Sequence, residues 1–201
     1  MLDSRLRPLI DPPLAIAARW LVARRITADQ VTVAAFAFGI AAAACIAIGW
    51  TTTALALLLL NRAGDGIDGA IARQTKATDR GGFLDISLDF VVYAAIPLAF
   101  AIRDPVPNAL PATALLSSFL ANGAAFLAFA IVASKRGLSS TSQGSKSFFF
   151  VAGLAEGTET VLVFTVVCLW PTAFPMLALG FAFLCGLSAA ARIVAGWRSF
   201  Q

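Results

Sequence analysis

Four aspartates in two apolar stretches are the residues of this chain best suited to chemistry. Asp65 and Asp68 are three positions apart, and Asp85 and Asp89 are four apart, so each pair would share one face of a helix. A short polar loop joins the two stretches, which makes the two helices antiparallel neighbours. The sequence therefore predicts a cluster of four carboxylates at one end of a helix pair.

Such a cluster is costly in an apolar chain. Each charge at membrane depth costs about 2.5–3.5 kcal/mol, so four approach the roughly 5–15 kcal/mol net stability of a domain. Two divalent cations would balance four negative charges, and all-oxygen ligation favours Mg²⁺, Mn²⁺ or Ca²⁺ over zinc or copper. The alternative is that arginines neutralise the acids for helix packing. Only Arg62 and Arg73 lie close enough in the sequence, which would leave two acids without an arginine.

Two such cations suit phosphoryl chemistry, because they bridge a diphosphate and stabilise the leaving oxygen. Gly69 would allow the backbone to approach a nucleotide closely, and Arg73 can bind phosphate in a bidentate manner. The chain has no histidine, which excludes Ser-His-Asp hydrolysis and histidine-ligated zinc and leaves a carboxylate, lysine or cysteine as base. These residues predict a metal-dependent phosphotransferase or hydrolase that acts on a membrane substrate.

The elements that must position these residues are apolar helices. Of 201 residues, 59% are hydrophobic and 13% charged, with a mean hydropathy of +0.84, whereas a soluble domain carries about a quarter charged residues. A run of about 20 apolar residues crosses a bilayer. The sequence therefore predicts an all-α integral membrane protein with six transmembrane helices, over residues 31–50, 53–73, 83–102, 108–133, 147–169 and 173–195.

Residues 1–30 form a segment of a different kind. The stretch 12–25 is too short and too rich in arginine to span, and its apolar residues recur at helical spacing. It predicts an amphipathic interfacial helix on the cytoplasmic face, ahead of a six-helix transmembrane catalytic domain over residues 31–201. Thr27 and Gln30 have the spacing of a capping box, which would open the first spanning helix.

Basic residues are distributed unevenly around these helices. Nearly all of them fall in the N-terminal segment and in the connections on the same side, whereas the opposite connections hold only Arg103. By the positive-inside rule, both termini and the aspartates would be cytoplasmic, in a bacterial cytoplasmic membrane. The net charge of +4 then indicates anionic membrane lipids as partners and no nucleic acid.

The aspartates belong to a longer pattern, which resembles the signature of the CDP-alcohol phosphatidyltransferase family (class I). That signature reads Asp-x2-Asp-Gly-x2-Ala-Arg-x7–8-Gly-x3-Asp-x3-Asp. The chain fills every fixed position, with Asp65, Asp68, Gly69, Ala72, Arg73, Gly81, Asp85 and Asp89. The resemblance implies a phospholipid-biosynthetic enzyme that moves a phospho-alcohol group from a CDP-alcohol, such as CDP-diacylglycerol, to an acceptor alcohol and releases CMP.

The resemblance also implies roles for single residues. The first three aspartates would bind two divalent cations, and Asp89 would bind metal and act as the general base. Gly69, Arg73 and Thr78 would contact the CDP moiety. The family's segment before the first span commonly reads Thr-Pro-Asp/Asn-x-x-Thr, so Asp29 and Thr32 are further candidates for CDP-alcohol binding. Ala28 stands here where the family has proline.

The acceptor pocket has weaker candidates. Glu156 and Glu159 fall near the start of the fifth predicted span, and an acid at membrane depth is a functional candidate. They could instead be interfacial acids bonded to threonines. The inositol-phosphate branch of the family resembles Glu-Arg-x-Glu-Arg here, and this chain has Gly157 and Thr160 in place of both arginines. A neutral or zwitterionic acceptor is therefore favoured, although positive charge could come from residues such as Lys135 and Arg136.

Two other functions use the same aspartates. A CDP-lipid hydrolase would take water as the acceptor, and a divalent-cation transporter would use the carboxylates as a cage near the bilayer midplane. The transporter gives no reason for the Asp-Gly-x2-Ala-Arg segment. Gly153 and Gly157 would let two helices approach closely, and a homodimer is one assembly that the sequence leaves open.

Overall fold

The computed structural model describes the backbone of residues 3–137 and 157–200, and the side chains from residue 11 onward within those ranges. Every regular element in these ranges is a helix. They are α1 (Asp3–Ala23), α2 (Ala28–Ala47), α3 (Thr51–Gln74), α4 (Asp79–Arg103), α5 (Pro105–Lys135), α7 (Gly157–Leu169), the 3₁₀ turn η1 (Pro171–Ala173) and α8 (Phe174–Ser199).

Local signals in the sequence set where the site-bearing helices begin. The capping box that opens α2 is confirmed, since Thr27 N donates to Gln30 Oε1 at 3.0 Å and Gln30 N to Thr27 Oγ1 at 3.3 Å. At the start of α4, the hydroxyl of Thr78 accepts from Gly81 N at 3.0 Å. Both caps satisfy backbone donors that a helix start leaves without partners. The two caps therefore fix the ends of the helices that carry Asp29 and Asp85.

Within the described ranges, four helices are long and apolar enough to cross a membrane: α2, α4, α5 and the continuous stretch Pro171–Ser199. α3 has 24 residues, which is also a spanning length, but from Arg62 to its end it carries both site arginines and two of the aspartates. The described part of α7 has 13 residues. The first part of the fifth predicted span, 147–156, lies outside the described residues. An all-helical apolar chain is therefore observed, and the count of six spans stays a prediction.

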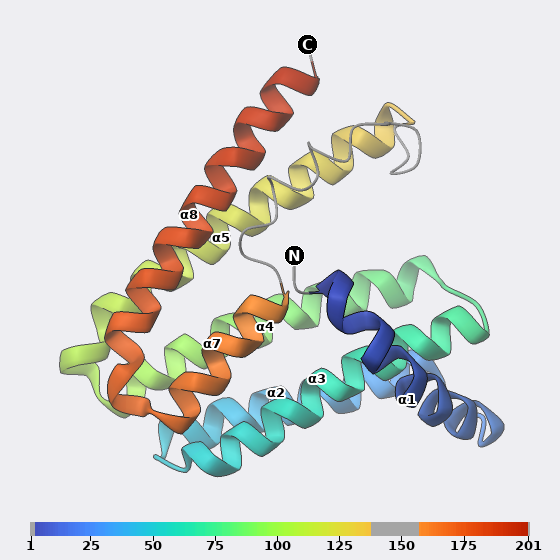
Figure 1. Ribbon diagram of the computed structural model, residues 1–201, viewed down its shortest axis with the longest axis horizontal. Helices are drawn as coiled ribbons and strands as arrows, with labels where there is room; N and C mark the ends of the chain where they lie inside the picture. Colours follow the sequence, from blue (N-terminus) through green and yellow to red (C-terminus); the bar gives the residue numbers. More distant parts are fainter. Residues whose placement is uncertain (1–2, 138–156, 201) are drawn as a thin grey trace.

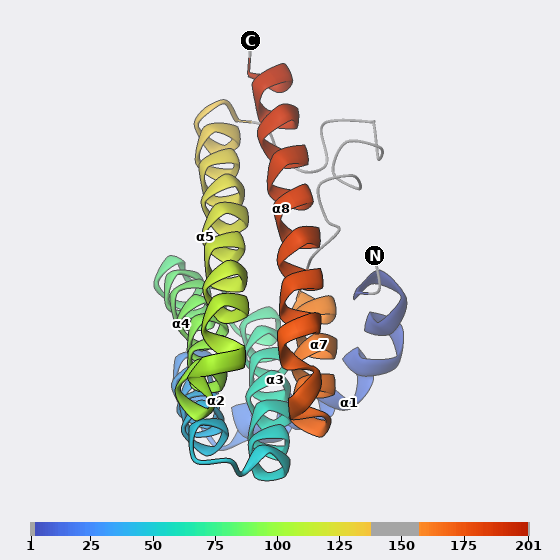
Figure 2. The ribbon, with the colours of Figure 1, turned by 90° about the vertical axis from the view of Figure 1, so that its left-hand side faces the viewer.

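α2, α3 and α4 lie side by side, and α5 and α8 form a second, longer pair that diverges from them (Figures 1 and 2). A buried cluster that includes Ile46, Leu58, Phe100 and Phe174 joins the two groups. Glycines allow the closest approaches: a Cβ at Gly64 would lie 2.6 Å from Ala35 Cβ, and one at Gly39 2.6 Å from Val92 Cγ2. Small residues at such contacts let membrane helices approach at backbone distance.

The N-terminal helix α1 crosses α3 near the end that bears the aspartates (Figure 1). It was predicted over residues 12–25, and it is longer at its N-terminal end and ends at Ala23. Ala18 is fully buried and packs with Ala70 and Ile71 of α3, whereas Trp20 on the other face is 56% exposed. One face of α1 is therefore buried against α3 and the other is exposed, and the position of α1 on the membrane surface stays a prediction. α2 begins at Ala28, three residues before the predicted domain boundary.

Candidate active site

The aspartates come from the facing halves of two antiparallel helices. α3 carries Asp65 and Asp68 in its last part, and α4 carries Asp85 and Asp89 in its first part. Only the turn of residues 75–78 separates the two helices, so both pairs lie toward the same end of the bundle, as their spacing predicts. The segments that bear the acids are helical, so their backbone N–H and C=O groups form hydrogen bonds within the helix and do not need the aspartate side chains as partners.

Three of the four aspartates form a compact group. Asp65, Asp68 and Asp85 each offer one carboxylate oxygen, and these three atoms lie within 4.8 Å of one another. Asp68 is 5% exposed, and its Oδ2 lies 2.5 Å from the hydroxyl oxygen of Thr32. Three converging carboxylates fit a hard divalent cation, which prefers oxygen ligands. The residues present are therefore suited to the kind of cation that the sequence predicts.

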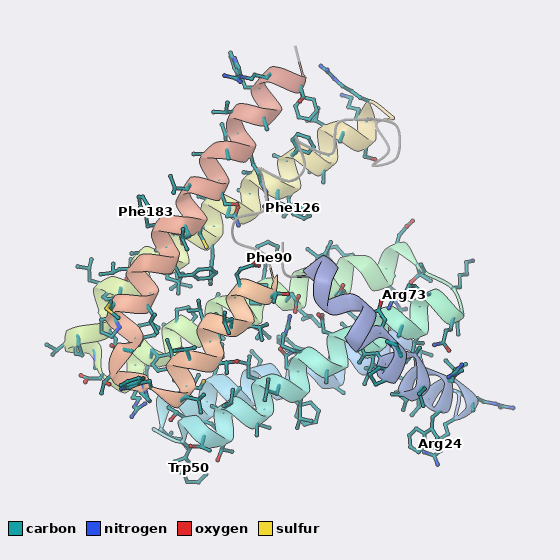
Figure 3. All side chains as sticks on the ribbon, in the orientation of Figure 1. Arg24, Trp50, Arg73, Phe90, Phe126 and Phe183 are labelled. Carbon is teal, nitrogen blue, oxygen red and sulfur yellow. The ribbon has the colours of Figure 1, made fainter. Side chains whose placement is uncertain are left out.

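Asp89 lies against an arginine of α3. Arg62 Nη2 donates to Asp89 Oδ1 at 2.5 Å, and Nη1 donates to Oδ2 at 3.3 Å. The same Nη1 lies 3.5 Å from Asp65 Oδ2. The alternative of arginine pairing is thus realised for two of the four acids, Asp65 and Asp89, both through Arg62. Arg73, the second arginine of α3, lies close to where α1 crosses this helix, and it is labelled in Figure 3. Its Nη1 lies beside Gly69.

A cavity of about 730 Å³ opens between the starts of α2 and α4 and the end of α3. Four of the five residues predicted to bind the CDP moiety line it: Asp29, Thr32, Gly69 and Thr78. Asp68 and Asp85 form its inner wall, and its lining includes Arg25, Lys76 and Arg80. We call it the α2 cavity. Its combination of cations and acids fits a polyanion that is held partly through divalent metal.

Two residues that line the α2 cavity form an ion pair that was not expected from the sequence. Arg80 donates to Asp29 Oδ2 through Nη2 at 2.5 Å and through Nε at 3.0 Å. The pair links the first turn of α2 to that of α4. Thr32, which was predicted to contact the CDP moiety, lines this cavity, but its hydroxyl is directed to Asp68 and to the carbonyl of Ala28. A hydroxyl has one proton, so it serves one of these two acceptors at a time.

A second cavity, of about 670 Å³, lies on the other side of α3 among α1, α3, α4 and α7. We call it the α7 cavity. Asp65, Asp89 and Arg62 face it, with Tyr93 of α4 and Thr158 of α7. Gly69 lines both cavities, whereas Arg73, which was grouped with the CDP-binding residues, lines the α7 cavity.

A third, narrow space of about 10 Å³ lies among residues that also line the two cavities. It is lined by all four aspartates together with Thr32 and Asn61. Thr32, Asp68 and Asp85 also line the α2 cavity, and Asp65 and Asp89 also line the α7 cavity. The carboxylates therefore form the wall between two sizeable cavities, and the space within that wall holds about one water molecule.

The four acceptor candidates have different surroundings. Glu159 is in the first turn of α7, next to Thr158 of the α7 cavity lining, and Glu156 lies outside the described residues. Lys135 ends α5 and is followed by Arg136, whose Nη2 donates to the carbonyl of Phe200 at 2.6 Å. Neither of these two residues is among those that line the α2 or the α7 cavity.

Two residues that support Arg62 were not identified from the sequence. Asn61 is 2% exposed; its Nδ2 donates to the carbonyl of Ala35 at 2.8 Å, and its Oδ1 accepts from Arg62 Nε at 2.8 Å. The hydroxyl of Tyr93 accepts from Arg62 Nη1 at 3.1 Å. A signal existed for both, because Asn61 and Tyr93 are polar residues within otherwise apolar helical stretches close to the aspartates.

Comparison with known proteins agrees with this geometry. The family model of the CDP-alcohol phosphatidyltransferases matches residues 25–195. The chain belongs to this family. Its members are transferases of phospholipid biosynthesis in membranes, and the resemblance seen in the signature is thereby confirmed. The match begins shortly before the capping box of α2 and leaves all of α1 outside.

Similar proteins cover almost the whole chain. The inner membrane protein YnjF of Escherichia coli (strain K12) is 44% identical over 201 residues, which is all of this chain and 98% of that protein. Its name and the apolar helices identify the chain as a membrane protein.

Solved structures support the fold. The phosphatidylinositol phosphate synthase PgsA1 of Mycobacterium tuberculosis with CDP-DAG bound has a TM-score of 0.71 at 19% identity, over 92% of this chain and 93% of that one. The same synthase with manganese and citrate has a TM-score of 0.66 at 18% identity, over 92% and 88%. At such identities the likeness concerns the fold.

Proposed function

We propose that this protein transfers the phosphatidyl group of a CDP-linked lipid, such as CDP-diacylglycerol, to an acceptor alcohol and releases CMP. One observation carries the proposal. The four signature aspartates form the wall between two cavities of about 730 and 670 Å³, as a transfer between two separately bound molecules requires. The CDP-DAG complex of the similar synthase PgsA1 supports the choice of a CDP-lipid donor.

The α2 cavity is the proposed donor site. Asp29, Thr32, Gly69 and Thr78 are the proposed contacts of the CDP moiety. Gly69 lies where both cavities meet, and a backbone without a side chain there lets the diphosphate lie close to α3. Arg73 on the α7 side would hold the phosphate of the lipid half through its guanidinium.

Asp65, Asp68 and Asp85 are the proposed metal ligands, joined by Asp89 for a second ion, with Mg²⁺ or Mn²⁺ as the cations. The manganese complex of PgsA1 supports this choice. When bound, the cations would neutralise the diphosphate and stabilise the charge on departing CMP. Thr32 orients the Asp68 carboxylate through a hydroxyl 2.5 Å from Oδ2, so this ligand is held in place before the donor arrives.

The α7 cavity is the proposed acceptor site, and Asp89 at its wall is the proposed general base. Asp89 takes the proton of the acceptor hydroxyl, the acceptor oxygen forms a bond to the lipid-side phosphorus, and the bond from that phosphorus to the oxygen of CMP breaks. The product is a phosphodiester lipid. Asp89 suits this role because the chain has no histidine and because its carboxylate faces the cavity.

A neutral or zwitterionic alcohol is the proposed acceptor. The arginines of the inositol-phosphate branch are replaced by Gly157 and Thr160. Of the two arginines that line the α7 cavity, Arg62 is engaged by Asp89. Glu159, next to the cavity lining, would add negative charge on the acceptor side. These features disfavour an acceptor that carries its own phosphate.

We also propose six membrane spans with both termini and the aspartates on the cytoplasmic side. The basic residues support this orientation through the positive-inside rule. Trp20 is exposed on α1, and the guanidinium of Arg24 lies 3.2 Å above its ring. An amphipathic ring beside a cation suits the headgroup region, and this position of α1 would bring the α2 cavity close to the supply of CDP-lipid.

The test uses the purified full chain in lipid with CDP-diacylglycerol, Mg²⁺ or Mn²⁺ and a panel of alcohols, with CMP release as the readout. Release should require both the cation and an acceptor. Release without any acceptor would indicate the hydrolase, and cation flux without CMP would indicate the transporter. Asp89→Asn should abolish turnover and leave the unfolding temperature within a few degrees, whereas full activity in this variant would exclude Asp89 as the base.

A further inference from the structure

The ion pair between Arg62 and Asp89 has no role in the transfer as proposed so far. We propose that Arg62 is a positioning residue that competes with the second divalent cation for Asp89. The chain would then bind one cation tightly and a second weakly until the donor diphosphate is present. This inference rests on the proposed metal site and assigns a function to a residue outside the family signature.

The guanidinium of Arg62 is held by groups other than the acids. Nε donates to Asn61 Oδ1 at 2.8 Å, and Nη1 donates to the hydroxyl of Tyr93 at 3.1 Å. Asn61 is itself buried and bonded to the carbonyl of Ala35 in α2. The side chain of Arg62 is only 13% exposed. Because Asn61 of α3, which is bonded to α2, and Tyr93 of α4 both accept from the guanidinium, its position beside Asp89 does not depend on the carboxylate alone.

Both carboxylate oxygens of Asp89 accept hydrogen bonds from this guanidinium, at 2.5 Å and 3.3 Å. A carboxylate that ligates a cation must turn an oxygen toward it, and the guanidinium repels a cation that approaches the same oxygens. Asp65, Asp68 and Asp85 meanwhile remain grouped within 4.8 Å. Arg62 Nη1 lies 3.5 Å from Asp65 Oδ2, but the hydrogen bonds that the guanidinium donates to a carboxylate go to Asp89. The first cation can therefore bind the group of three without breaking those bonds, whereas a second cation that uses Asp89 must displace Arg62.

Counting charges gives the same order of binding. Four carboxylates and one guanidinium carry a net charge of about −3 when all are ionised. After the first dication the site holds about −1, where it would hold about −2 without Arg62. The net negative charge that attracts the second dication is thus half of what it would be without Arg62. A diphosphate restores negative charge to the site, so the second cation should enter together with the donor.

The rival explanation is that Arg62 only fastens α3 to α4. A fastening residue would affect unfolding, and its removal would lower or leave unchanged the affinity for both cations. Competition makes the opposite prediction, that removing the guanidinium strengthens the second cation alone. The affinities of the two cations therefore separate the explanations.

The experiment is a titration of the purified full chain in detergent with Mn²⁺, in the absence of nucleotide, with free Mn²⁺ measured by electron paramagnetic resonance. The wild type should bind one ion tightly and a second at least tenfold more weakly. Arg62→Met should strengthen the second ion at least tenfold and the first less than threefold. Arg62→Lys, which keeps the charge, should leave the second ion weak.

Arg73→Met is the matched control, because it removes a positive charge from the same helix eleven positions further on. It should change the second affinity less than threefold. In the double variant Arg62→Met with Asp89→Asn, the stronger binding of the second Mn²⁺ should disappear, since Arg62 affects this ion only through its contact with Asp89. Should Arg62→Met not fold, Arg62→Gln provides the same loss of charge with a polar group for Asn61.

Three results would overturn the inference: two ions of equal affinity in the wild type, an unchanged second affinity without the guanidinium, or an equal gain in Arg73→Met. Persistence of the gain in the double variant would do so as well. None of these results depends on turnover, so the transferase proposal would survive them. Conversely, the absence of CMP release with the expected Mn²⁺ binding would exclude the transferase and leave the competition at Asp89 in place.

Discussion

Replacing Gly64 by alanine should impair catalysis more than it impairs stability. Gly64 precedes Asp65 on α3, and a Cβ there would lie 2.6 Å from Ala35 Cβ of α2. Carbon atoms in contact are normally about 3.5–4.0 Å apart. The two helices must therefore separate by about 1 Å, at a point close to Asp68 and to the Thr32 hydroxyl that lies 2.5 Å from it.

The size of each effect follows from this displacement. Overpacking costs about 1–3 kcal/mol, and alanine recovers about 1 kcal/mol relative to glycine within a helix. The net loss of stability is then about 0–2 kcal/mol. A misplacement of about 1 Å can reduce a rate by about 100-fold, because ligand and orienting groups on α2 and α3 no longer meet.

The assay combines CMP release from CDP-diacylglycerol with thermal unfolding in detergent. Gly186→Ala in α8 is the control, since nothing lies within 4 Å of the added Cβ. It should unfold at or slightly above the wild-type temperature and keep the wild-type rate. If Gly64→Ala folds and retains more than half of the rate, the spacing of α2 and α3 does not set the geometry of the site.

Three further changes test separate parts of the site. Chelation with EDTA should lower the unfolding temperature, because Mn²⁺ at one hundred times its dissociation constant adds about 2.7 kcal/mol; no shift in a thermal scan would contradict the metal site. Thr32→Val should destabilise the metal-free protein by about 1.5–3 kcal/mol through the lost bond to Asp68, and less with Mn²⁺ bound, as the same scan would reveal. Gly69→Ala meets only Arg73 Nη1, at 3.3 Å, so unfolding should be unchanged. Its methyl group at the junction of the cavities should raise the KM for CDP-diacylglycerol about tenfold, and an unchanged KM would remove Gly69 from the donor site.

The parts of the site that were predictable depend on short spacings. Asp65 and Asp68, and then Asp85 and Asp89, are fixed to one helix face by the helical repeat, and the turn between the helices sets which ends meet. The capping box of Thr27 is local in the same way and is confirmed. Such features need no knowledge of how the helices are rotated against each other.

Partner choice between helices does depend on that rotation. Arg62 is three positions from Asp65, which makes Asp65 its natural partner by spacing. It lies 3.5 Å from Asp65 but 2.5 Å from Asp89, 27 positions away. The hydroxyl of Tyr93, which accepts from Arg62 Nη1 at 3.1 Å, favours this outcome, and Tyr93 lies on another helix, 31 positions away. The same dependence explains why Arg73 lines the α7 cavity and not the α2 cavity.

The narrow space between the two cavities constrains the order of events in the proposed reaction. A space of about 10 Å³ holds neither substrate, so the proposed donor and acceptor would meet at the carboxylates from the α2 and α7 cavities, which adjoin at Gly69. Both substrates would be bound when the phosphorus changes partner. Initial-rate kinetics should then give intersecting lines, as in a ternary complex, rather than the parallel lines of a ping-pong scheme. A single displacement across the wall would also invert the configuration at phosphorus.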